Sequence, residues 1–73
     1  MDFVFEIKKH LATLRTSNTG WTRELNLVSW NGAPPRYDIR DWSPDKEQMT
    51  KGVTLTEEDA IAVANAIMEE VRR

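Results

Sequence analysis

The sequence predicts an α+β fold in which four strands are followed by one C-terminal amphipathic helix. Through residues 3–55, apolar and polar residues alternate in runs that turn-forming clusters separate, and such a period of two is typical of half-buried strands. From residue 56 the apolar period lengthens to about 3.6, the period of a helix. We therefore expect a single domain over residues 1–73.

The first strand is expected from an alternation that starts at Phe3 and Phe5 and changes phase near Lys8 and Lys9. One extra residue moves every later side chain to the opposite face, so a β-bulge near these lysines explains the change of phase. TSNTG at residues 16–20 predicts a turn. WTRELNLVSW, which follows it and is rich in aromatic and aliphatic residues, predicts a second strand.

The second and third strands are expected to form a hairpin. NGAPP at residues 31–35 combines an Asn-Gly turn signal with two prolines, so the chain reverses there. RYDIRDW at residues 36–42 then predicts the third strand. After a charged loop, KGVTL at residues 51–55 predicts a short fourth strand, in which Gly52 indicates a bulge or a close approach of the backbone.

The helix is expected to begin after Thr56, a natural N-cap with Asp59 three residues later, as in a capping box. Its apolar stripe spans about 160°, wider than the roughly 100° that contact with one sheet requires. We expect the stripe to cover one sheet face and its excess width to form a homodimer. A helix buried deeply in its own core is the alternative explanation. The expected interface residues are Ile61, Val63, Ala64, Ile67 and Met68.

Composition excludes several classes of protein. The 73 residues contain no cysteine and a single histidine, His10, so neither a metal nor another cofactor is expected. No apolar run approaches the roughly 20 residues of a membrane span, and the N-terminus lacks a signal-peptide pattern, which predicts a cytoplasmic protein, free or associated with the nucleoid. Without a phosphate-binding loop or an enclosed cavity, an enzyme is not expected.

A row of aromatic and cationic side chains is the strongest functional signal. Alternate residues of a strand share one face, so Arg36, Arg40 and Trp42 lie together in the third strand. Leu25 and Leu27 of the second strand would face the helix. The other face of the second strand would then lie on the same side of the sheet as this row. The face left bare by the helix is then expected to hold Asn26, Trp30, Arg36, Arg40 and Trp42.

Two indoles and two guanidiniums on an exposed sheet suit single-stranded nucleic acid, because each base stacked on an aromatic ring contributes about 1–3 kcal/mol and each linker offers a phosphate. Lys46 is a further candidate for a phosphate contact. Asp38 can pair with the neighbouring arginines, and His10 is expected to be structural. Duplex DNA is discounted because the expected helix is acidic and would not enter the major groove.

Three segments resemble the transcriptional coactivator family of positive cofactor four. They are VSWNG at 28–32, YDIRDW at 37–42 and KGVTL at 51–55, followed by the amphipathic helix. The blocks around the DIR strand are similar to the small bacterial YdbC-like branch. The resemblance implies a curved antiparallel sheet, a dimer formed through the helices, and single-stranded DNA lying across both sheets.

By position, the resemblance makes Trp30 the stacking aromatic, Arg40 the arginine of the DIR strand and Lys51 the lysine before the motif's glycine, while Trp42 fills an aromatic position. The eukaryotic members have a more basic loop before the fourth strand, whereas here Lys46 lies between Asp45 and Glu47. Binding is therefore expected to depend on stacking and to have a shallow salt dependence.

The expected function is single-stranded DNA binding with little sequence preference by a homodimeric, transcriptional-coactivator-like protein. Two alternatives stay open. The exposed sheet can instead dock a protein of the transcription or replication machinery, and single-stranded RNA can use the same stacking contacts.

Overall fold

The structure, a computed structural model, describes residues 4–72, so Phe3 lies outside the described residues. These residues form four strands and one helix in the expected order. The elements are β1 (Phe5–Thr16), β2 (Thr22–Trp30), β3 (Arg36–Trp42), β4 (Val53–Leu55) and α1 (Glu57–Val71). The strands form one antiparallel sheet in the order β1-β2-β3-β4. The α+β prediction is confirmed, although β4 is shorter than expected.

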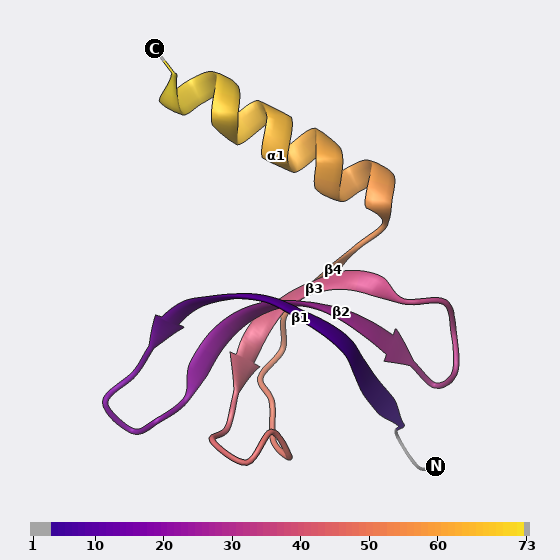
Figure 1. Cartoon of the computed structure of the whole chain (residues 1–73), viewed down its shortest axis with the longest axis vertical. Coiled ribbons are helices and arrows are strands. Elements are labelled where there is room, and N and C mark those ends of the chain that lie inside the picture. Colours follow the sequence, from indigo (N-terminus) through magenta and orange to yellow (C-terminus); the bar gives the residue numbers. More distant parts are fainter. Residues whose placement is uncertain (1–3, 73) are drawn as a thin grey trace.

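The sheet is strongly curved, and Figure 1 shows it as an arch whose strand ends point away from α1. The register of β1 against β2 shifts between Ile7 and Lys9, which confirms the bulge expected near Lys8. Two further shifts follow along β1, after His10 and after Thr13, and the sequence did not indicate them. Because each extra residue bends and twists its strand, three of them allow β1 to follow the arch.

The hairpin between β2 and β3 has the turn that its sequence predicts. Asn31 and Gly32 both have positive φ, 52° and 78°, and the Ala33 N–H donates to the Trp30 carbonyl at 2.9 Å. Positive φ at both central residues is the property of the two-residue turns that match the twist of antiparallel strands. The register that follows sets Leu25 opposite Ile39, so the expected parity of the two strands is confirmed.

The core lies on the concave side of the arch, which is a correction to the expectation. Val28 and Trp42 are 0% exposed, and the ring of Trp42 packs 5.2 Å from that of Phe5. On the helix side, by contrast, Leu25 and Ile39 are only half-buried. The expected bare face is therefore filled by its own side chains, because the curvature brings the two ends of the strands toward each other.

Helix α1 begins at the predicted cap, where the Asp59 N–H donates to Thr56 Oγ1 at 3.1 Å. The helix then extends away from the sheet (Figure 1), and none of its residues is buried. Ile61 and Ile67 are 54% and 56% exposed. The expectation that the apolar stripe covers a sheet face is therefore wrong for the single chain. No helix within residues 4–72 has the length and hydrophobicity that a membrane span requires.

Candidate nucleic-acid interface

A cation–π contact between Arg40 and Trp30 lies at the centre of the candidate interface. The Cζ atom of Arg40 lies 4.6 Å from the centroid of the Trp30 ring, and the Phe5 ring lies 5.9 Å from the same indole. Across the ladder Arg40 pairs with Glu24 rather than Trp30, so the curvature of the arch brings the two side chains together. The sequence placed them on one face without showing that they touch.

A buried carboxylate holds Arg40 in this position. Its Nε and Nη2 donate to the two carboxylate oxygens of Asp38 at 2.6 and 2.7 Å, the bidentate geometry of a strong charge-assisted pair. Asp38 is 0% exposed and also accepts a hydrogen bond from the Thr54 hydroxyl at 2.9 Å. The pairing of Asp38 with an arginine of the row is confirmed, and only 12% of the Arg40 side chain is exposed.

Gly52 lets the segment before β4 pass close to Arg40. A Cβ atom at residue 52 would lie 2.3 Å from the Ile39 carbonyl oxygen and 2.5 Å from Arg40 Cβ. Separations this short are not tolerated without a shift of the backbone, so the close approach expected at this glycine is confirmed. Lys51, directly before it, is exposed.

Two cations of the expected site remain accessible. Arg36 is exposed and pairs across the ladder with Val28, two positions before Trp30, so it lies on the same side of the sheet as the indole. Lys51 is exposed as well. Neither makes an ion pair within the described part of the chain. The half-buried Trp30 and these two cations are therefore residues of the expected site that a ligand can reach.

Two other residues of the expected site are enclosed. Trp42 is 0% exposed, and its indole N–H is buried without a hydrogen-bond partner among residues 4–72. Asn26 is also 0% exposed, and its amide donates to Glu24 Oε1 at 3.1 Å. The expectation that Trp42 and Asn26 lie on a solvent-exposed face is therefore wrong, because the curved sheet encloses its concave side.

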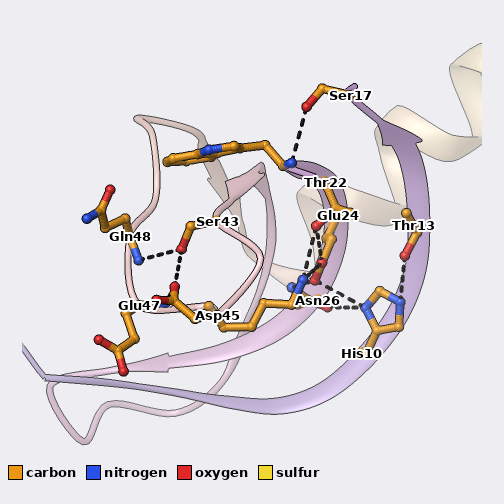
Figure 2. Close-up of polar contacts among 12 residues, drawn as sticks. His10, Thr13, Ser17, Thr22, Glu24, Asn26, Ser43, Asp45, Glu47 and Gln48 are labelled. Carbon is orange, nitrogen blue, oxygen red and sulfur yellow. Dashed lines mark hydrogen bonds and ion pairs between the residues drawn. The ribbon is translucent and has the colours of Figure 1, made fainter. Parts of the chain in front are cut away.

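Lys46 belongs to a polar network that ties the loop after β3 to the sheet. Its ammonium donates to Glu24 Oε2 and, at 3.0 Å, to the Thr22 hydroxyl. Figure 2 shows the network continuing through Asn26 to His10, whose Nδ1 lies 2.7 Å from Asn26 Oδ1. A phosphate contact by Lys46 would have to compete with a carboxylate whose side chain is 5% exposed. His10 has the structural position that was expected.

Because of this network, part of the free energy of unfolding depends on pH. Burial alone would raise the pKa of Glu24, but hydrogen bonds from Lys46, Thr22 and Asn26 outweigh it and hold the pKa below the usual 4.5. Since the folded state favours the carboxylate, this stabilisation is complete above pH 4.5 and is lost as the pH falls through the folded-state pKa.

We expect urea unfolding at a series of pH values to show stability falling below pH 4.5 and Glu24→Gln to reduce that fall. Part of the fall should remain in the variant because the pKa values of Asp41 and Asp45 are also lowered, chiefly by hydrogen bonds from Arg23 and Ser43. An unchanged pH profile in Glu24→Gln would contradict the role of this carboxylate.

Comparison with known proteins also relates this chain to a nucleic-acid-binding family. The chain matches the family of the transcriptional coactivator p15 (PC4) over residues 17–66. The chain belongs to this family. An uncharacterized protein of Treponema pallidum (strain Nichols) is 50% identical over 66 residues, which cover 90% of this chain and 78% of the relative. The resemblance to the family is confirmed, and this relative is consistent with a bacterial branch of it.

The PC4 family is a nucleic-acid-binding family and not a family of enzymes. The matched residues run from the turn before β2 into α1 and include Trp30, Arg40 and Lys51. Phe5 of β1 lies before the match, although its ring contacts both Trp30 and Trp42. Sequence reasoning gave Phe5 no role at the site. Its place beside the indole follows from the register of β1 against β2, which sets Phe5 opposite Trp30 and which the sequence does not show.

Proposed function

We propose that this PC4-family protein binds single-stranded DNA as a homodimer, with little sequence preference and in a coactivator-like role. A base would stack on Trp30 while Arg36 and Lys51 contact phosphates. The observation that carries the proposal is an indole held by Arg40 and Phe5. Exposed Arg36 shares its face of the sheet, exposed Lys51 precedes the glycine that packs against Arg40, and neither cation forms an ion pair within residues 4–72. The proposal places the protein in the cytoplasm, free or on the nucleoid.

Single strands suit this arrangement better than a duplex. Bases of a single strand have open faces that can stack on an aromatic ring, and stacking reads no base edges, which explains the low sequence preference. Helix α1 has Glu57, Glu58 and Asp59 in its first turn. Their negative charge opposes insertion of the helix into a major groove.

The apolar surface of α1 supports the homodimer. Ile61, Val63, Ile67 and Met68 are 45–56% exposed in the single chain. Three of them also line an open hollow of about 360 Å³ between the helix and the sheet, with Ala64 and Leu25 among its other walls. A chain of 73 residues buries a small fraction of its surface, so its stability is marginal. An exposed apolar face on such a chain is therefore typical of a surface that another molecule covers. A second copy of the chain is the occupant that we propose.

The test is titration with oligo-dT at low salt, followed both by fluorescence anisotropy of a labelled strand and by tryptophan emission. We expect binding with quenching, and Trp30→Ala should weaken the affinity about 10- to 100-fold, the value of one stacked base. Arg72→Ala, at the far end of α1, is the control and should bind like the natural sequence. Absence of binding at low salt would refute the proposal.

Competition experiments separate the alternatives. Matched RNA and DNA oligomers of equal length compare the two nucleic acids, because both use the same stacking contacts. A transcription or replication partner that stays bound after nuclease treatment would favour protein docking, whereas loss of that partner would favour DNA.

A further inference from the structure

We infer that Arg40 is a positioning residue for Trp30 and not a phosphate ligand, and that Asp38 and Thr54 anchor it. The inference rests on the proposed function and assigns the residues of that site to separate tasks. Trp30 would stack with a base, Arg36 and Lys51 would meet the phosphates, and Arg40 would hold the indole in place.

The donors of Arg40 are already occupied in the free protein. Nε and Nη2 bind Asp38, and Nη1 donates to the Thr50 carbonyl at 3.3 Å and lies 3.6 Å from the sulfur of Met49. Nη2 also lies 3.5 Å from the Thr54 hydroxyl. A guanidinium has five N–H donors in a fixed plane. With its side chain 12% exposed, Arg40 has little left to offer a phosphate.

Moving Arg40 toward a phosphate would also leave Asp38 behind. This carboxylate is 0% exposed, and besides Arg40 it has the Thr54 hydroxyl as a partner. Removing one member of a buried ion pair is strongly unfavourable, because the other charge stays buried without compensation. The pair is moreover electrically neutral as a whole, so it adds little attraction for a polyanion.

The same contacts give Arg40 a different use. Its guanidinium lies over the Trp30 ring at 4.6 Å, with the Phe5 ring tilted by 49° at 5.9 Å. An indole that is already oriented loses less conformational freedom when a base stacks on it, and such preorganisation increases affinity. Arginine is suited to this role because a planar guanidinium can stack and bind a carboxylate in bidentate fashion, which an ammonium group cannot.

The experiment measures how oligo-dT affinity depends on salt. For a single strand, each phosphate that the protein neutralises contributes about 0.7 to the slope of log affinity against log salt concentration. We expect Arg40→Lys, which keeps the charge, to weaken binding about tenfold at every salt concentration, and Arg40→Met to weaken it with the slope unchanged. Arg36→Gln is the matched control and should lower the slope by about 0.7 for each subunit whose Arg36 contacts the strand. Full affinity in Arg40→Lys, or a slope lowered in Arg40→Met, would overturn the inference.

A second measurement needs no DNA. The indole N–H resonance of Trp30, assigned by its disappearance in Trp30→Phe, should shift in Arg40→Lys and in the milder variant Thr54→Val, but not in Arg36→Gln. Thr54→Val keeps the inference testable if Arg40→Lys does not fold. If the natural sequence fails to bind oligo-dT while the resonance shifts as expected, the proposed function fails and the contact stands. An unmoved resonance contradicts the contact itself.

Discussion

Replacing Trp42 by alanine is expected to remove most of the free energy of unfolding at room temperature. Trp42 has the largest fully buried side chain within residues 4–72, and it packs against Phe5 on the concave side. Truncation of a buried tryptophan to alanine costs about 3–5 kcal/mol. Small domains have a free energy of unfolding at the lower end of about 5–15 kcal/mol, so little or none would remain.

Urea unfolding followed by circular dichroism measures this loss. Trp42→Phe, which keeps a ring near Phe5, should lose less than the alanine variant. Val4→Ala is the control at an exposed apolar position, 59% accessible, and should change the free energy of unfolding by less than about 0.5 kcal/mol. If Trp42→Ala unfolds at the same urea concentration as the natural sequence, the concave side is not the core.

Replacing Ile67 by glutamate is expected to convert the proposed dimer into monomers. Ile67 is 56% exposed in the single chain and lines the hollow between α1 and the sheet, where a second copy would bury it. The variant loses the burial of the isoleucine and, in addition, places an unpaired carboxylate in an apolar contact. We expect the dimer dissociation constant to rise about 100-fold or more, which corresponds to about 2.7 kcal/mol.

Sedimentation velocity over a range of concentrations measures the change. Ala62→Glu introduces the same charge five residues away, on the side of α1 opposite the apolar stripe, and should leave the dimer intact. A monomeric natural sequence at every concentration would refute the homodimer. Dimers that survive in Ile67→Glu would place the interface away from α1.

Local chemistry explains where sequence reasoning succeeded. The Thr56 cap and the Asn31-Gly32 turn depend on hydrogen bonds and φ values within a few residues, and both occur as predicted. Strand parity depends only on the period of two, so Leu25 and Ile39 share the expected face. The family was also recognisable, because its motifs lie in short continuous segments within residues 17–66.

Local sequence signals could not predict which side chains are buried and which are exposed to solvent. Parity correctly placed Trp42 on the side away from α1, but it did not show that this side is closed. Closure depends on the accumulated bend of the whole sheet, to which the three bulges of β1 contribute. The same bend brings Arg40 onto Trp30, although the register sets Arg40 opposite Glu24.

The amino-acid sequence by itself determined the order of the strands and helix, the turns between them and the side of the sheet on which each residue lies, because neighbouring residues control these features. Only the tertiary structure decided that Trp42 is core, that Arg40 is held by Asp38 and that Trp30 remains half-accessible. These outcomes depend on contacts between residues far apart in the chain, and the curvature that creates those contacts is a property of the complete sheet.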